Sequence, residues 1–144
     1  MLITKYDQIL ARRLREEVAT LHRNLRRGIR NTEQLSLAEE NVVGFLVYQP
    51  GARPSELSQR LKMSSQFVSQ VLNRLHTLGF ICRRTLASDK RISLISLTER
   101  GKHLIELRRR EKEDLLAALI SDKFTNTEKR QIASAIDLLT RLHE

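Results

Sequence analysis

Apolar residues recur at helical spacing along most of the chain, and the first such stretch covers residues 5–30. Its apolar positions follow one another at steps of three or four, the period of one face of an α-helix. Arginines occupy many of the other positions around this stripe. The pattern predicts a long first helix with a coiled-coil-like apolar face. The residues of this face are Leu14, Val18, Leu21, Leu25 and Ile29.

Two shorter helices are predicted next. Ser36 and Glu39 form a capping box, in which a hydroxyl and a carboxylate bind backbone N–H groups that a helix start leaves unpaired. We expect this helix to continue through an apolar stretch until Pro50 ends it. Pro54 then suits the first position of a helix over residues 54–62, because its missing N–H is not needed there.

A third, amphipathic helix is predicted over residues 65–78, and the period changes after it. Ser64 can cap this helix, and Gly79 supplies its left-handed C-terminus. Two further stretches, 80–86 and 92–97, have the composition of strands and predict a β-hairpin with a polar, basic tip. The apolar stripe of the helix consists of Phe67, Val68, Val71, Leu72, Leu75 and Leu78.

Two more helices complete the expected architecture. Thr98 can cap a helix over residues 99–120, and a second capping box joins Thr125 to Glu128 at the start of the last helix. We therefore predict a mainly α-helical fold with a small β-hairpin wing: a winged helix-turn-helix flanked by N- and C-terminal helices. The apolar face of the last helix carries Ile132, Ala135, Ile136, Leu139 and Leu142.

The polar face of the 65–78 helix carries the candidate chemistry. It holds no acidic residue, whereas a helix surface that meets only water is more often rich in Glu and Lys. Gln can pair with adenine, Arg with guanine or phosphate, and Ser with base edges or phosphate oxygens. We therefore expect this face to contact DNA, although a solvent-exposed face without a ligand is the plainer interpretation. Its residues are Ser65, Gln66, Ser69, Gln70, Asn73 and Arg74.

The predicted hairpin adds a second basic feature. Lys90 and Arg91 lie at its tip, and Arg84 lies near its base beside Arg83. A basic tip can enter a minor groove, whose narrow A·T stretches attract arginine. Asp89 is placed to hold the Arg91 guanidinium by a local salt bridge. Alone this tip would be a common surface turn, but next to the amphipathic helix it predicts DNA contacts by Arg84, Asp89, Lys90 and Arg91.

At this point the sequence resembles the MarR family of winged-helix regulators. The resemblance rests on Ser55-Glu56-Leu57-Ser58-Gln59-Arg60-Leu61, Leu72-Asn73-Arg74-Leu75, Leu78-Gly79-Phe80-Ile81-Cys82-Arg83-Arg84, Asp89-Lys90-Arg91 and Ser96-Leu97-Thr98-Glu99-Arg100-Gly101. It implies one MarR-like domain over residues 1–144, with a winged helix-turn-helix lobe over 34–98 and a helical dimerisation region over 1–30 and 99–144.

The resemblance also implies a homodimer in which each protomer binds half of a pseudo-palindromic operator. It implies DNA contacts by the polar face named above and by Arg91, and a dimer interface built from the first, fifth and sixth helices. The residue pattern points the same way, because the apolar faces of the first and last helices have no partner within a small DNA-binding unit. A twofold partner is the economical way to bury them.

Charge is concentrated where DNA contacts are predicted. The formal net charge is +9, and residues 53–91 alone hold eight Lys or Arg against two acidic residues. Such a region suits a phosphate backbone or an anionic membrane surface, or it is simply basic. No apolar run approaches the roughly 18 residues of a membrane span, and charges interrupt any N-terminal signal peptide. We expect a cytoplasmic protein with no membrane partner.

Other chemistries find little support in the sequence. Cys82 is the one cysteine, so no internal disulfide is expected, and a small buried hydrophobe is preferred over a redox sensor. The four histidines lack ligand spacing, so we predict no metal or other cofactor. No nucleophile–base motif or phosphate-binding loop is present, so we predict no enzyme.

Two functions remain open. The first is a sequence-specific DNA-binding regulator, a homodimeric repressor that a small-molecule effector releases from its operator. The alternative is a winged-helix interaction module whose basic face binds an acidic protein or RNA.

Overall fold

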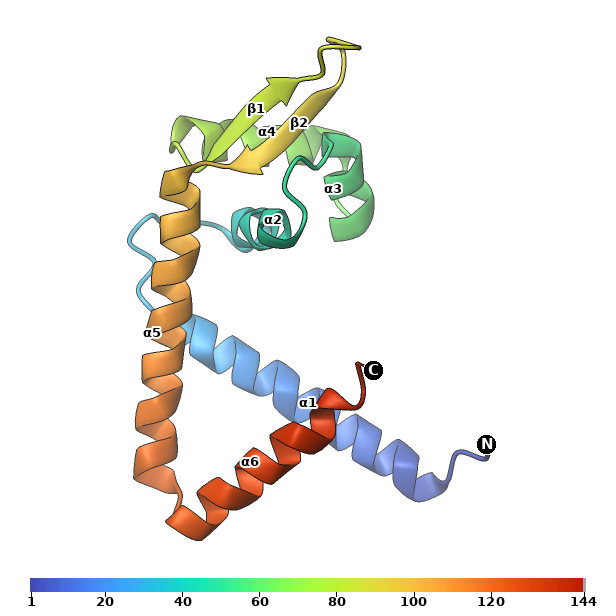
Figure 1. Cartoon of the computed structure of the whole chain (residues 1–144), viewed down its shortest axis with the longest axis vertical. Coiled ribbons are helices and arrows are strands. Elements are labelled where there is room, and N and C mark those ends of the chain that lie inside the picture. The colour runs from blue at the N-terminus through green and yellow to red at the C-terminus, as the bar shows by residue number, and fades with distance from the viewer. Residues whose placement is uncertain (144) are drawn as a thin grey trace. The chain divides into compact units, whose positions relative to one another are not determined.

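The computed structural model describes residues 1–143, which form six helices and one two-stranded sheet (Figure 1). In chain order these are α1 (Lys5–Gly28), α2 (Leu37–Tyr48), α3 (Pro54–Leu61), α4 (Ser65–Thr77), β1 (Ile81–Thr85), β2 (Ser93–Leu97), α5 (Glu99–Lys123) and α6 (Asn126–Thr140). The predicted fold class, mainly helical with one hairpin wing, is confirmed.

The chain divides into two compact units. The winged unit is Asn31–Arg109, and the helical unit combines residues 1–30 with the chain from Arg110 onward. The first part of α5, up to Arg109, therefore belongs to the winged unit.

The core of the winged unit lies between α2, α3, α4 and the hairpin. The strands pair antiparallel, with Ile81 opposite Leu97 and Arg83 opposite Ile95. Ala52 adds a single bridge to Ile95, whose N–H donates to the Ala52 carbonyl at 2.8 Å. The most deeply buried side chains of this core are Leu46, Leu57, Leu75, Ile81, Ile95, Val42, Val43 and Val68.

Local capping by side chains fixes where α2 and α4 begin. The Ser36 hydroxyl accepts from the Glu39 N–H at 3.2 Å, and the Glu39 carboxylate accepts from the Ser36 N–H at 2.7 Å. The Ser64 hydroxyl accepts from the Phe67 N–H at the start of α4. Gly79 ends this segment with a φ of +80°, a left-handed conformation that glycine adopts readily. These predicted caps are confirmed.

The start of α5 is fastened to the base of the hairpin. The Thr98 hydroxyl accepts from the Gly101 N–H at 3.1 Å and donates to the Gly79 carbonyl at 2.5 Å. The Thr98 N–H also donates to the Phe80 carbonyl at 3.0 Å. The guanidinium of Arg100 lies 5.2 Å from the centroid of the Phe80 ring. One threonine therefore caps α5 and links it to the turn that follows α4.

The helical unit consists of α1, α6 and the remainder of α5. The described structure places no buried residue on α1 or α6. Both helices begin with capping boxes, in which Thr4 binds Asp7 and Thr125 binds Glu128. These hydrogen bonds favour the ionised carboxylates and lower the pKa of both acids. Large apolar side chains remain exposed on the two helices: Tyr6, Ile9, Leu10, Val18, Leu21, Ile136 and Leu138.

Four helix ends differ from the prediction by one to three residues, and one of them is the end of α3, at Leu61 rather than residue 62. The first helix ends at Gly28 rather than at residue 30, because Ile29 is already extended. α4 ends at Thr77, one residue early. α5 continues to Lys123 rather than 120, since the polar residues after 120 contain no helix breaker and Thr125 starts the next helix.

Candidate DNA-binding interface

Four polar residues at the start of α4 form an open surface. Their side chains are exposed, and within residues 1–143 they make no side-chain hydrogen bond or ion pair; we call them the recognition surface: Ser65, Gln66, Ser69 and Gln70. The opposite face of the helix packs into the core through Val68, Val71, Leu72 and Leu75. The sequence prediction that this face points outward is therefore confirmed. Its hydroxyl and amide groups can donate to and accept from a ligand.

Asn73 lies one turn further along α4, and it is held by the hairpin. Its side-chain oxygen accepts a hydrogen bond of 2.6 Å from the guanidinium of Arg83, on β1. This contact joins the last part of α4 to β1, the strand that runs beside α4 in Figure 1. The amide NH2 of Asn73 remains able to donate to another partner.

Arg74 turns toward the start of α2 instead of continuing the recognition surface. Its Nε lies 2.8 Å from a carboxylate oxygen of Glu39, and its Nη2 donates to the Gln34 carbonyl at 3.3 Å. The Glu39 side chain is 6% exposed, and that of Arg74 is 51% exposed. The guanidinium is thus already bound within the protein, which the sequence did not reveal.

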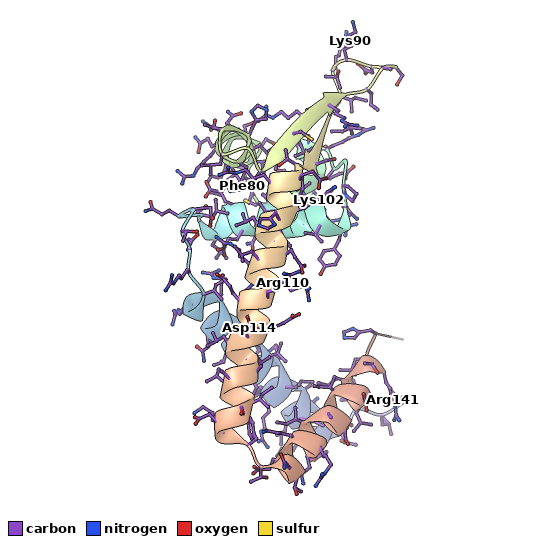
Figure 2. The ribbon with its side chains drawn as sticks, turned by 60° about the vertical axis from the view of Figure 1, so that its left-hand side comes forward. Phe80, Lys90, Lys102, Arg110, Asp114 and Arg141 are labelled. Atoms are coloured by element: carbon purple, nitrogen blue, oxygen red, sulfur yellow. The ribbon has the colours of Figure 1, made fainter. Side chains whose placement is uncertain are left out.

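The wing tip, defined as Asp89, Lys90 and Arg91, is exposed at the end of the hairpin. Figure 2 shows Lys90 at the outermost point of this loop. The Asp89 carboxylate accepts from the backbone N–H of Arg91 at 2.9 Å, and the described structure contains no Asp89–Arg91 salt bridge. The prediction that Asp89 holds the Arg91 guanidinium is therefore wrong. Asp89 instead stabilises the turn, because its short side chain can accept a hydrogen bond from the backbone N–H two residues further along the chain.

Arg84 lies apart from the recognition surface. Strand alternation places it on the same face as Cys82, and opposite to that of Arg83, which contacts α4. Arg84 and Cys82 line an open groove of about 780 Å³ together with Ser96 and Lys102. Cys82 is half-buried in this groove, and so it is less buried than the small buried hydrophobe that the sequence favoured.

Phe67 is a surface residue that the sequence pattern did not identify. The prediction placed it in the apolar stripe of the helix, but 44% of the residue is exposed. It belongs to the first turn of α4, beyond the part of the helix that the core covers. Its position one residue before the buried Val68, at the edge of the stripe, was the signal available in the sequence.

The loop before α2 is fixed by a buried arginine. Arg108 of α5, 7% exposed, binds the carboxylate of Glu40 and donates to Asn31 Oδ1 at 2.7 Å. Its guanidinium also lies 3.4 Å from Glu33. Burial alone would raise the pKa of Glu33, but hydrogen bonds from Thr32, its own backbone and Arg108 together lower it. Residues 31–40 are therefore held to α5.

Neither a metal centre nor a membrane span is found in the described residues. No three His, Cys, Asp or Glu side chains among residues 1–143 are grouped so that they could hold a metal ion. No described helix combines the length and the apolar character that crossing a bilayer requires.

Comparison with known proteins identifies the fold. Residues 34–92 match the model of the MarR family. The uncharacterised HTH-type transcriptional regulator YdgJ of Bacillus subtilis is 31% identical over 108 residues, 75% of this chain and 63% of YdgJ. The chain thus spans less than two thirds of the length of that relative.

Two solved structures share the architecture over nearly the whole chain. The transcriptional regulator Tm0710 of Thermotoga maritima has a TM-score of 0.81 at 21% identity and covers 94% of this chain and 95% of its own. FabT of Streptococcus pneumoniae, solved in complex with DNA, has a TM-score of 0.60 at 20% identity and covers 92% of this chain and 96% of its own. The winged-helix prediction is confirmed.

Proposed function

We infer that this chain is a member of the MarR family, whose model matches residues 34–92, and that it is a transcriptional regulator that binds double-stranded DNA. The observation that carries the inference is the recognition surface on α4, four exposed polar residues without partners in residues 1–143. The DNA complex of the structurally similar FabT supports the same use of the fold.

The proposed contacts divide into two kinds. The recognition surface and the Asn73 amide enter the major groove and contact base edges, as the second helix of a helix-turn-helix does. Lys90 and Arg91 of the wing tip contact phosphates or enter the adjacent minor groove. Asp89 supports that loop through its backbone hydrogen bond. Arg84 remains a proposed phosphate contact on the outer face of the hairpin.

The proposal includes a homodimer that acts as a repressor on a pseudo-palindromic operator. The exposed apolar side chains of α1 and α6 support dimerisation, since a monomer would leave them in water. Two copies related by a twofold axis would bury the same surface on each. Release by a small-molecule effector and a cytoplasmic location also remain proposals.

Salt dependence of binding tests the proposal against its alternative. For a DNA-binding regulator, the logarithm of the association constant for random-sequence duplex should fall linearly with the logarithm of salt concentration, with a slope of about −0.9 per phosphate contacted. An interaction module should bind the duplex hardly at all and should prefer an acidic polypeptide or a single-stranded RNA at matched ionic strength. Fluorescence anisotropy with the three labelled probes distinguishes these results. Failure to bind duplex DNA at low salt contradicts the proposed function.

A further inference from the structure

Arg74 occupies an unusual place for a cation on a DNA-binding helix. It follows Asn73 on the exposed side of α4, yet its Nε is 2.8 Å from Glu39 and its Nη2 reaches the Gln34 carbonyl. Both partners lie far from α4 in sequence, at the start of α2 and in the loop before it. The Arg74 side chain therefore connects α4 to the start of α2 and to the loop before it.

Glu39 is committed to this connection at both carboxylate oxygens. Oε2 accepts from the Ser36 N–H at 2.7 Å and so completes the capping box of α2, whereas Oε1 binds Arg74. The residue is 5% exposed. Loss of the arginine would leave one oxygen of a buried carboxylate without a partner in the described structure, which is costly in a place that water hardly reaches.

The start of α2 and the loop before it are in turn bound to α5. Arg108 binds Glu40, in the first turn of α2, and Asn31, at the start of the preceding loop. Asn31 in turn donates to the Leu35 carbonyl at 2.8 Å and accepts from the Leu35 N–H at 2.9 Å. Polar contacts thus run from α5 to Leu35, continue through the backbone to Ser36, and lead from there to Glu39 and Arg74.

From these contacts we propose that Arg74 is a positioning residue. It sets the angle of α4 relative to α2 through its contact with Glu39, and it does not bind DNA. The inference rests on the proposed function, because it concerns how that DNA contact is made. It replaces the direct DNA contact that the sequence alone suggested for Arg74. Its main consequence is that a buried acidic residue, Glu39, supports DNA binding although its charge opposes the approach of phosphates.

The decisive variant is Glu39→Gln. Glutamine is compatible with the capping box, but its single side-chain oxygen faces both the Ser36 N–H and the Arg74 guanidinium, so at least one contact weakens. If Arg74 bound phosphate directly, removal of a nearby negative charge would leave DNA affinity unchanged or raise it. If Arg74 acts through Glu39, the affinity must fall.

Glu56→Gln is the matched control. Glu56 is an exposed carboxylate on α3, in the same winged unit, and makes no ion pair in the described residues. Its replacement changes the net charge by the same amount without touching Arg74. It should leave affinity unchanged or slightly increased, so any loss specific to Glu39→Gln reports the contact with Arg74 and not the charge.

The measurement is anisotropy with two labelled duplexes: one recovered by selection from a random pool with the wild-type protein, and one of random sequence. It is made at a temperature where melting curves show every variant fully folded. Arg74→Ala and Glu39→Gln should each weaken binding to the selected duplex by about tenfold. Binding to random duplex should change little, since it depends mainly on charge.

The double variant, Arg74→Ala with Glu39→Gln, should bind the selected duplex no more weakly than the weaker-binding of the two single variants. This follows because both substitutions remove the same interaction. Arg74→Lys, which retains a cation able to reach Glu39, should recover part of the loss.

The salt slope separates positioning from contact. Arg74→Ala should keep the wild-type slope, whereas Arg91→Ala, a proposed phosphate contact, should reduce its magnitude by about 0.9. The inference is overturned if Arg74→Ala reduces the slope as Arg91→Ala does, or if Glu39→Gln binds the selected duplex as tightly as Glu56→Gln. A wild-type protein that binds neither duplex overturns the proposed function as well, so the two failures are distinguishable.

Discussion

Replacement of Gly101 by alanine should weaken the joint between α5 and the base of the wing. Gly101 is buried in the first turn of α5 against the backbone of Phe80. An added methyl group would overlap the Phe80 carbonyl oxygen and would lie 3.3 Å from Leu97 Cδ2. That oxygen also accepts the N–H of Thr98 at 3.0 Å. Because the obstructing atom belongs to the backbone, it cannot rotate away as a side chain could.

The magnitude follows from three contributions to the free energy of unfolding. Overpacking of a well-filled site costs about 1–3 kcal/mol, and a weakened Thr98–Phe80 hydrogen bond costs about 1 kcal/mol. The higher helix propensity of alanine returns about 1 kcal/mol. We therefore expect Gly101→Ala to lower the free energy of unfolding by about 1–3 kcal/mol, which corresponds to a fall in Tm of roughly 3–10 °C for a chain of this size.

Gly44→Ala provides the control for this experiment. Gly44 lies within α2, and a Cβ there would meet no atom within 4 Å. Its replacement should raise the free energy of unfolding by about 0.5–1 kcal/mol, through helix propensity alone. Both variants are compared with the wild type by thermal circular dichroism at one protein concentration, because association would shift Tm. A Gly101→Ala variant that melts at or above the wild-type temperature would refute the packing argument.

Three further predictions concern the interface and its support. Arg91→Ala should weaken binding to selected and random duplexes alike, and equal affinity at one fixed salt concentration would remove Arg91 from the contacts. Gln70→Ala should weaken binding to the selected duplex while random-duplex binding is unchanged; an equal loss on both would mean that Gln70 does not contact bases. The lowered pKa of Glu33 means that this group stabilises the fold above its ordinary pKa of 4.5 and that the contribution is lost as pH falls through the folded-state pKa. In urea titrations from about pH 6 to about pH 3, Glu33→Gln should therefore lose less stability than the wild type, and an identical pH dependence would contradict this assignment.

Features fixed by short-range chemistry were predictable from the sequence. Ser36, Ser64 and Thr125 each cap a helix through a partner three residues away, so the signal and the interaction lie in the same few residues. The left-handed conformation at Gly79 also follows from a local requirement that glycine meets readily. The spacing of apolar residues three or four positions apart then predicted the inner and outer faces of α4.

Interactions between distant residues were not predictable in the same way. Arg74 and Glu39 lie on different helices, and Arg108 lies 68 residues from Glu40. Nothing in the spacing of these residues signals that they meet, since the contact depends on how the helices pack. The sequence therefore identified an outward face correctly but could not show that Arg74 is already bound within the protein. Phe67 differs from these residues, because its place at the edge of the apolar stripe was visible in the sequence, although where the core ends was not.

Selection of bound sequences from a random pool of duplex DNA tests the central claim most directly. The account predicts enrichment of an inverted repeat whose half-sites are about 10 base pairs apart from centre to centre, because two recognition helices of a twofold dimer enter successive major grooves on one side of the duplex. Enrichment should disappear when the selection uses a Gln66→Ala/Gln70→Ala variant that remains folded. Recovery of no common sequence by the wild-type protein at low salt would contradict the account.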